Sequence, residues 1–221
     1  MKTVLVTGGS RGIGKAICER FALAGYRVVA PTRSEMDLAD ASSVEAFVSS
    51  NRNIEFDVII NNAGINDIHS IEQITDEEID RAIAINLTSP MRLLRGLVGG
   101  MKHRGYGRIV NIGSIWAVVS KAGRCVYSAT KNGIHGVTNT LAIELAPNGI
   151  LVNTVCPGFT LTELTYQNNS PEQIAAICTE IPLGRIAEPS EIAELVFFLG
   201  SEQNTYITGQ KITADGGFTQ R

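Results

Sequence analysis

The 221-residue sequence has no long hydrophobic run and no excess of charge of either sign. Its first apolar stretch, Val4-Leu5-Val6, ends at once in Thr7-Gly8-Gly9, and no segment approaches the roughly 18 consecutive apolar residues that a membrane helix needs. We therefore expect neither a signal peptide nor a membrane partner. A net charge of −3 disfavours nucleic acid as a partner.

Cysteine and histidine are scarce, and neither forms a binding pattern. The four cysteines include no C-x-x-C pair, and the three histidines share no ligand spacing. We predict no metal site and a reduced, cytoplasmic setting. The hydrophobic content of 44% is ordinary for a globular protein, and the length suits one domain.

Short apolar segments alternate with helix-length amphipathic segments along the whole chain. The predicted strands are Lys2–Thr7, Arg27–Ala30, Asp57–Asn61, Arg108–Ile112, Ile150–Cys156 and Gln210–Ala214. The predicted helices are Gly12–Ala24, Ser42–Ser50, Asp76–Lys102, Arg124–Ala146 and Pro189–Leu199. Uninterrupted apolar strands indicate a sheet covered on both faces, and strand–helix alternation indicates parallel pairing. We predict a single-domain α/β fold over residues 1–221, with a doubly wound, Rossmann-type sheet.

The region after the second predicted strand is unusually short. Between Arg27–Ala30 and Asp57 there is room for one helix only. One crossover helix is therefore missing, and any additional edge strand has to lie within Pro31–Asp40 without a helix of its own.

A glycine-rich turn joins the first predicted strand to the first predicted helix. It reads Thr7-Gly8-Gly9-Ser10-Arg11-Gly12-Ile13-Gly14. Glycines permit a tight turn and let backbone N–H groups approach a pyrophosphate at a helix N-terminus. In this strand–turn–helix setting, the motif predicts dinucleotide binding.

A set of motifs is spread along the chain: T-G-x-x-x-G-x-G at Thr7–Gly14, N-N-A-G at Asn61–Gly64, Asn86, Ser114, Y-x-x-x-K at Tyr127–Lys131, Pro157-Gly158, Ile181–Gly184 and Gly209–Gly217. Taken together, these motifs resemble the short-chain dehydrogenase/reductase family over essentially the whole chain. Within that family, the pattern is most similar to 3-oxoacyl-acyl-carrier-protein reductases and their relatives.

Tyr127 and Lys131 lie four residues apart in a predicted helix, so their side chains share one face. Transfer of a hydride to a carbonyl carbon requires a proton at the oxygen. A fixed ammonium and a cationic nicotinamide both favour the phenolate, which lowers the pKa of the tyrosine. Ser114, just after the strand Arg108–Ile112, would hold the substrate oxygen. We identify Ser114, Tyr127 and Lys131 as catalytic residues.

Asn86 is the fourth predicted catalytic residue. Pro90 lacks the N–H that would bond the Asn86 carbonyl in a regular helix, which leaves that carbonyl free to hold a water. In the resembled family, the residue at this position binds a water that relays protons to the lysine. The alternative is an incidental helix kink.

The end of the second predicted strand bears on the choice of cofactor. A carboxylate there binds the ribose 2′-hydroxyl of NAD, whereas an arginine accommodates the 2′-phosphate of NADP. The segment reads Ala30-Pro31-Thr32-Arg33 with no carboxylate before Glu35, and Arg11 supplies a second guanidinium. We predict NADP(H), with NAD(H) as the alternative if Glu35 turns toward the ribose.

The resemblance implies further cofactor contacts. Asp37 and Leu38 resemble the pair beside the adenine, and the loop after Pro157 resembles the loop on the nicotinamide side. Residues 157–188 are predicted to form a substrate lid. The predicted cofactor-binding residues are Gly8, Gly9, Ser10, Arg11, Gly12, Ile13, Gly14, Thr32, Arg33, Asp37, Leu38, Asn62, Ala63, Gly64, Tyr127, Lys131, Pro157, Gly158, Thr160 and Thr162.

These features predict an oxidoreductase that transfers a hydride between NADP(H) and a carbonyl or secondary alcohol. The substrate expected from the resemblance is a 3-oxoacyl thioester or similar ketone, free or carrier-linked. The alternatives are a reductase of a sugar-linked ketone and a non-catalytic NADP-sensing protein. The resemblance also implies a homotetramer, or a homodimer, built on the helices Asp76–Lys102 and Arg124–Ala146, with Gly133 and Gly136 allowing close helix approach.

Overall fold

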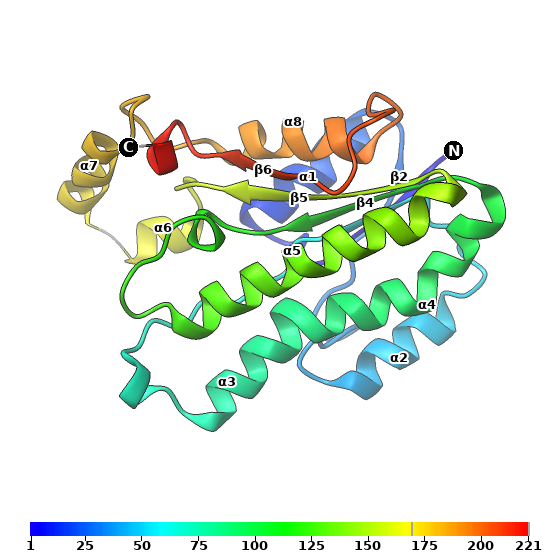
Figure 1. Cartoon of the computed structure of the whole chain (residues 1–221), viewed down its shortest axis with the longest axis horizontal. Helices are drawn as coiled ribbons and strands as arrows, with labels where there is room; N and C mark the ends of the chain where they lie inside the picture. Colours follow the sequence, from blue (N-terminus) through cyan, green and yellow to red (C-terminus); the bar gives the residue numbers. More distant parts are fainter. Residues whose placement is uncertain (169, 221) are drawn as a thin grey trace.

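The computed structural model describes residues 1–168 and 170–220, and it contains one parallel sheet with helices on both faces (Figure 1). The sheet order is β2-β1-β3-β4-β5-β6. Its strands are β1 (Thr3–Val6), β2 (Arg27–Val29), β3 (Val58–Asn61), β4 (Gly107–Ile112), β5 (Ile150–Pro157) and β6 (Lys211–Ala214). The predicted doubly wound α/β fold is confirmed.

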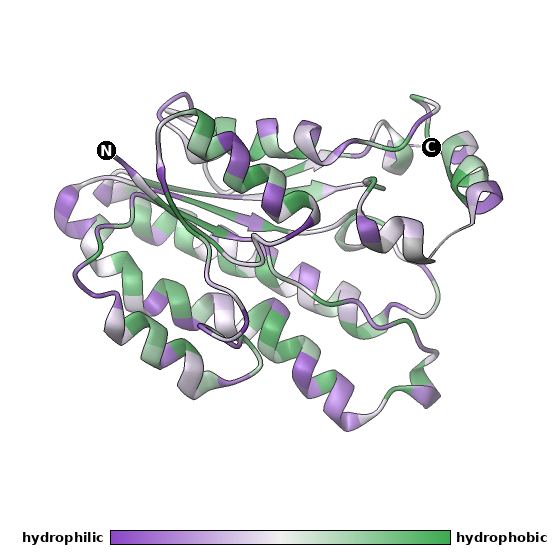
Figure 2. Cartoon of the chain, turned by 180° about the vertical axis from the view of Figure 1, so that it is seen from behind, coloured by the Kyte–Doolittle hydropathy of each residue, from purple (hydrophilic) through white to green (hydrophobic). Residues whose placement is uncertain are grey.

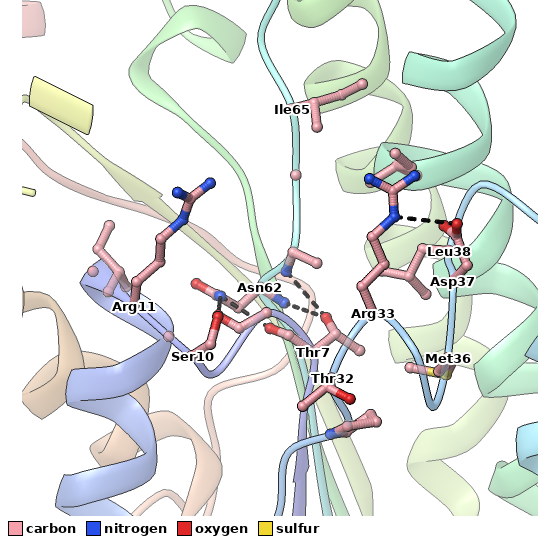
Figure 3. Close-up of a pocket in the computed structure, with 18 of the residues that line it drawn as sticks. Thr7, Ser10, Arg11, Thr32, Arg33, Met36, Asp37, Leu38, Asn62 and Ile65 are labelled. Carbon is pink, nitrogen blue, oxygen red and sulfur yellow. Dashed lines mark hydrogen bonds and ion pairs between the residues drawn. The ribbon is translucent and has the colours of Figure 1, made fainter. Parts of the chain in front are cut away.

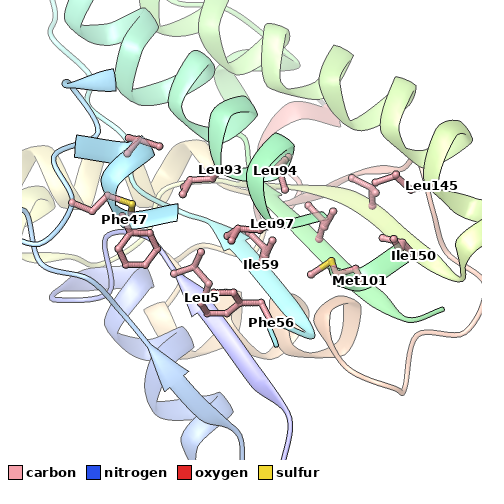
Figure 4. Close-up of a cluster of buried hydrophobic side chains, with 14 of the residues drawn as sticks. Leu5, Phe47, Phe56, Ile59, Leu93, Leu94, Leu97, Met101, Leu145 and Ile150 are labelled. Carbon is pink, nitrogen blue, oxygen red and sulfur yellow. The ribbon is translucent and has the colours of Figure 1, made fainter. Parts of the chain in front are cut away.

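Each face of the sheet packs against its own helix layer. One layer contains α1 (Gly12–Leu23) and α8 (Pro189–Gly200), and the other contains α2 (Ala41–Ser50), α4 (Ser89–Arg104) and α5 (Cys125–Leu145). Neighbouring strand residues serve opposite cores, because side chains alternate across a strand. Leu5 packs with Phe47, Leu93 and Met101 (Figure 4), whereas Val4 packs on the other face.

Hydropathy follows these layers. Seen from behind in Figure 2, the central strands are largely hydrophobic, and hydrophilic residues gather in the surrounding loops and on the helices. The strands β1, β3 and β4 are buried at every position. No helix in the described part of the chain is long and apolar enough to cross a membrane.

The sheet ends at β2, where the sequence predicts a missing crossover helix. Hydrogen-bonded turns occupy the segment between β2 and α2, and Met36 N–H bonds the Thr32 carbonyl at 2.9 Å. No strand of the described chain lies outside β2. The possible edge strand within Pro31–Asp40 is therefore absent, because these residues bond among themselves in turns.

The predicted long helix Asp76–Lys102 is divided into three parts. A regular helix, α3 (Asp76–Ile83), begins with a capping box, in which Thr75 and Glu78 bond each other's backbone N–H. It runs into a π-helical turn, η2 (Ala84–Thr88), and then into α4. In η2, Ser89 N–H bonds the Ala84 carbonyl five residues earlier. Because Pro90 cannot donate at the next turn, the helix widens there.

Candidate functional site

The glycine-rich turn lies at the carboxyl end of β1 and leads directly into α1. Gly8 and Gly12 have positive φ angles of 67° and 53°. A Cβ on Gly14 would lie 2.1 Å from the Gly8 carbonyl oxygen, so no side chain fits there. No side chain caps the first turn of α1. Its N-terminus is therefore suited to bind an anionic group.

A cavity of about 410 Å³ opens beside this turn (Figure 3). Residues from the glycine turn, the β2–α2 segment, the end of β3 and the loop after β5 line it. Of the predicted cofactor-binding residues, the cavity is lined by Gly8, Ser10, Arg11, Gly12, Ile13, Gly14, Thr32, Arg33, Asp37, Leu38, Asn62, Ala63, Gly64 and Thr162.

Two predicted cofactor-binding residues have additional roles in packing. A Cβ on Gly9 would lie 2.7 Å from Cys18 Sγ and 2.9 Å from Ala30 Cβ. Gly9 therefore lets α1 approach β2, and it does not line the cavity. The Asn62 side chain donates to the carbonyls of Thr7 and Gly8 at 3.0 and 3.1 Å, which ties β3 to the glycine turn.

Thr7, which the sequence analysis did not single out, also connects these two segments. Its hydroxyl accepts hydrogen bonds from the backbone N–H groups of Asn62 and Ala63, both at 3.0 Å. The threonine at the start of the T-G motif was the sequence feature that could have indicated this connection.

Two arginines lie on opposite sides of the cavity, whereas Glu35 does not line it. Figure 3 shows Arg11 and Arg33 on opposite sides of the cavity. Arg33 is highly exposed and pairs with Asp37 at 3.2 Å. The Glu35 carboxylate instead accepts hydrogen bonds from the Thr32 N–H and hydroxyl at 2.7 and 2.8 Å, and it borders a separate hollow. Glu35 therefore does not turn toward the ribose position in this structure.

Ser114, Tyr127 and Lys131 meet at the carboxyl edge of the sheet. Ser114 follows β4, and its hydroxyl accepts a hydrogen bond from Trp116 N–H at 3.2 Å. Tyr127 and Lys131 lie on one face of α5, with Lys131 Nζ 5.7 Å from the tyrosine ring centroid. The Ser114 side chain is near enough to the Tyr127 hydroxyl to lower its pKa by hydrogen bonding. The three predicted catalytic side chains are thus neighbours.

Lys131 is almost completely buried. Its Nζ donates to the Ile112 carbonyl at 2.7 Å, which fixes the amine behind the end of β4. A Cβ on Gly64 would lie 3.2 Å from this Nζ, so the glycine leaves room for the lysine. Burial lowers the pKa of Lys131 from 10.5 to about 8, because the interior disfavours the charged form.

The pKa of Tyr127 is raised, mainly because the phenol is buried. The hydrogen bond with Ser114 and the positive charge of Arg124 act in the opposite direction. The Lys131 Nζ faces the tyrosine ring and bonds the Ile112 carbonyl, and its predicted part in lowering the Tyr127 pKa stays a prediction. No motif in the sequence points to Arg124, and its position three residues before Tyr127 was the available signal.

Asn86 joins three segments around the site. Its side-chain oxygen accepts from Ile65 N–H, and its amide donates to the Ile65 carbonyl, both at 2.9 Å. The amide also donates to the Thr130 hydroxyl on α5 at 3.1 Å. Asn86 therefore holds the segment after β3 against α5, and the role of its backbone carbonyl in a proton relay stays a prediction.

The loop after β5 closes over the glycine turn at one point. Thr162 lines the cavity, and its Cγ2 lies 3.2 Å from the position of a Cβ on Gly12. The predicted residues Pro157, Gly158 and Thr160 do not line the cavity: Pro157 ends β5, and Gly158 N–H bonds the Ala214 carbonyl at 2.9 Å. The predicted lid continues through α6 (Glu163–Asn168) and α7 (Pro171–Glu180), and its movement stays a prediction.

Comparison with known proteins gives matches over nearly the whole chain. Residues 31–219 match the family described as Enoyl-(Acyl carrier protein) reductase, and residues 2–43 match the family described as short chain dehydrogenase. The chain is 37% identical to 3-oxoacyl-[acyl-carrier-protein] reductase of Vibrio cholerae, over 98% of this chain and 96% of the relative. It is 39% identical to acetoacetyl-CoA reductase of Rhizobium meliloti, over 98% of each.

A solved structure is similar over the same extent. The structure of a putative NAD(P)-dependent gluconate 5-dehydrogenase from Beutenbergia cavernae, with bound NADP, gives a TM-score of 0.94 at 30% identity. The match covers 100% of this chain and 97% of that one. The alignments with both curated relatives extend over 237 positions, more than the length of this chain. The relatives therefore contain residues that this chain lacks, in keeping with its short β2–α2 region.

Proposed function

The chain belongs to the short-chain dehydrogenase/reductase family, and we propose that it reduces a ketone to a secondary alcohol with NADPH. One observation carries the proposal: the Ser114, Tyr127 and Lys131 side chains are neighbours at the sheet edge that also bears the cavity beside the glycine turn. A protein that merely sensed the dinucleotide would have no need of these three groups beside it.

Ser114 and Tyr127 act at the carbonyl oxygen of the substrate. Ser114 lies close enough to the phenol to lower its pKa, so a substrate oxygen bound beside them can accept from both hydroxyls. When bound, NADPH supplies the hydride for the carbonyl carbon. As negative charge develops on the oxygen, Tyr127 donates a proton to it, and Ser114 keeps it in place. The Lys131 ammonium, held by the Ile112 carbonyl, stabilises the phenolate that remains.

The residues around the cavity favour NADPH over NADH. The glycine turn leaves room for a pyrophosphate, because side chains at Gly8 or Gly14 would collide with neighbouring backbone. Arg33 lines the cavity just past the end of β2, Arg11 lines its opposite side, and a guanidinium group suits a 2′-phosphate. Glu35, the candidate partner for the 2′-hydroxyl of NAD, is bonded to Thr32. The NADP bound to the Beutenbergia cavernae protein further supports this preference.

The named activities of the relatives support a 3-oxoacyl thioester as substrate. The Vibrio cholerae and Rhizobium meliloti proteins are a 3-oxoacyl-[acyl-carrier-protein] reductase and an acetoacetyl-CoA reductase. Both names denote a ketone two carbons from a thioester carbonyl. We assign the same substrate class to this chain.

Purified protein should oxidise NADPH in the presence of acetoacetyl-CoA, with kcat/KM at least about tenfold higher for NADPH than for NADH. The measurement is the fall in nicotinamide absorbance with each cofactor, against acetoacetyl-CoA, simple ketones and a sugar-linked ketone. Binding of NADPH without turnover on any carbonyl would contradict the proposal and favour the sensor. Turnover of the sugar-linked ketone alone would overturn the thioester assignment.

Arg33→Ala serves as a control on the cofactor assignment. The variant loses one charge-assisted contact, worth about 1.5–3 kcal/mol. The ratio of kcat/KM for NADPH to that for NADH should therefore fall about tenfold or more, while kcat/KM for NADH stays nearly unchanged. An equal loss with both cofactors would mean that Arg33 does not bind the 2′-phosphate.

We also propose that the chain assembles through α4 and α5 into a homotetramer or homodimer. A largely apolar groove of about 620 Å³ lies between these helices, with Met91, Val98 and Leu141 among its lining. A Cβ on Gly136 would meet nothing within 4 Å, so a second helix can approach there. Gly133 is not available for this role, because its face is filled by Leu87 of the same chain.

Gly136→Arg should therefore reduce the native mass while leaving the fold intact. The introduced side chain projects from an open position into the proposed interface. Light scattering measures the mass, and far-UV circular dichroism checks the fold. Leu23→Arg, at a highly exposed position on α1 in the other helix layer, is the matched control and should keep the wild-type mass. A monomeric wild-type protein, or an unchanged mass for Gly136→Arg, would exclude this interface.

A further inference from the structure

Arg124 lies at the N-cap of α5, one helical turn before Tyr127. Its guanidinium carbon lies 5.1 Å from the centroid of the Trp116 ring, and its positive charge acts on the Tyr127 hydroxyl. The side chain is thus directed back toward the catalytic edge of the sheet. Because the charge of Arg124 acts on the phenol, the guanidinium lies on the side of α5 that carries Tyr127.

The guanidinium of Arg124 has donors without acceptors. Its Nε and Nη1 are buried and have no hydrogen-bond partner in the described part of the chain. None of the ion pairs among the described residues includes Arg124. A buried donor without a partner costs about 1–3 kcal/mol, more when it is charged, so such a group calls for an explanation.

A second buried arginine shows how this chain satisfies a structural guanidinium. Arg108, at the start of β4, is 7% exposed. Its guanidinium donates to the backbone carbonyls of Gly107, Gly149, Ser201 and Asn204. Arg124 has no comparable bonds, and its side chain does not cap α5. Its N–H groups are available for an acceptor that is not part of the described chain.

Aromatic rings fix the surface on which Arg124 lies. Trp116 contacts Phe159 and Phe218 edge to face, with both pairs of centroids 6.1 Å apart, and Phe159 contacts Phe218 at 5.3 Å. A guanidinium stacked on an immobilised ring keeps its planar fork in one orientation. The fork therefore contacts the ring two residues after Ser114, and its charge acts on the Tyr127 phenol.

We propose that Arg124 determines substrate specificity by binding a second oxygen of the substrate, on the carbon two positions from the reacting ketone. The inference rests on the proposed ketone reduction and names the residue that would recognise the second oxygen of its substrate. Two kinds of substrate offer this acceptor oxygen. A 3-oxoacyl thioester provides it as the C1 carbonyl, and a 3-oxo acid provides it as the carboxylate. A thioester oxygen would take one N–H of the fork, and a carboxylate would take two.

The test compares acetoacetyl-CoA and acetoacetate with 2-pentanone, which lacks the second oxygen. Arg124→Gln should lower kcat/KM for the better 3-oxo substrate by about 10- to 100-fold and change that for 2-pentanone by less than about threefold. Arg124→Lys keeps the charge without the fork and should fall between these limits. The ratio of acetoacetyl-CoA to acetoacetate turnover in the wild type identifies which source of the oxygen is used.

Several results would overturn the inference while leaving ketone reduction in place. One is wild-type kcat/KM for 2-pentanone equal to that for both 3-oxo compounds. A second is an equal loss in Arg124→Gln for all substrates, with a matching shift of the pH profile, because Arg124 would then act through Tyr127. A third is a changed native mass, which would pair Arg124 with a neighbouring subunit. Absence of NADPH turnover with any ketone would instead refute the proposed function.

Discussion

Tyr127→Phe should lower kcat by about 10³-fold or more while the protein still binds NADPH. General acid catalysis contributes roughly 10²–10⁴-fold, and the phenol is the proton donor that the Ser114 hydrogen bond places at the carbonyl oxygen. The phenylalanine ring keeps the packing near Lys131, so the dinucleotide cavity should be undisturbed. Steady-state kinetics with acetoacetyl-CoA gives kcat, and fluorescence titration gives the Kd for NADPH.

Ser114→Ala is the matched control for this variant. It removes a hydroxyl that orients the oxygen but donates no proton in the net reaction, so its effect on kcat should be smaller than that of Tyr127→Phe. Its pH profile carries a further expectation. Because the Ser114 hydrogen bond lowers the pKa of Tyr127, its removal should move the alkaline limb of kcat to higher pH. Turnover above a tenth of wild type in Tyr127→Phe would refute the assigned role.

The fold was largely predictable because its strands are uninterrupted apolar runs. Val58–Asn61 is buried at every position, as a strand between two helix layers must be. The division of the predicted helix Asp76–Lys102 was not predicted. It depends on Pro90 together with contacts between Asn86 and Ile65, which lies 21 residues away. Such contacts are set by tertiary structure, and the helical pattern alone does not reveal them.

The site was predictable in its membership and less so in its electrostatics. Spacing alone placed Tyr127 and Lys131 on one helix face. The effect of an ionisable group on the pKa of a neighbour depends on where the charged end of its side chain lies. The Lys131 amine bonds the Ile112 carbonyl, and the neighbours that lower the Tyr127 pKa are Ser114 and Arg124. Similarly, the role of Gly9 in helix packing depends on Cys18 and Ala30, which the motif does not include.

Lys131→Met should abolish most activity and yet stabilise the cofactor-free protein at neutral pH. Burial lowers the Lys131 pKa from 10.5 to about 8, and each pKa unit corresponds to about 1.4 kcal/mol. The folded state therefore bears a cost of about 3 kcal/mol for keeping the buried ammonium at pH 7. Methionine removes this cost but leaves the Ile112 carbonyl without its donor. The unpaired carbonyl lowers the stability of the variant by about 1–2 kcal/mol. We expect a net gain of about 1–2 kcal/mol.

The pH dependence of this gain distinguishes it from a general packing effect. Between the folded pKa of about 8 and the ordinary value of 10.5, the unfolded chain holds a proton that the folded chain has released. The free energy of unfolding of the wild type should therefore rise with pH in this window, and Lys131→Met should lack that rise. Urea unfolding without NADPH at pH 7 and pH 10 measures both. A variant that is less stable at pH 7, or whose difference from wild type is the same at both pH values, would show that the ammonium is not strained by burial. A gain that disappears at high pH, combined with lost turnover, would show that the family's active-site lysine is kept here for chemistry at the expense of stability.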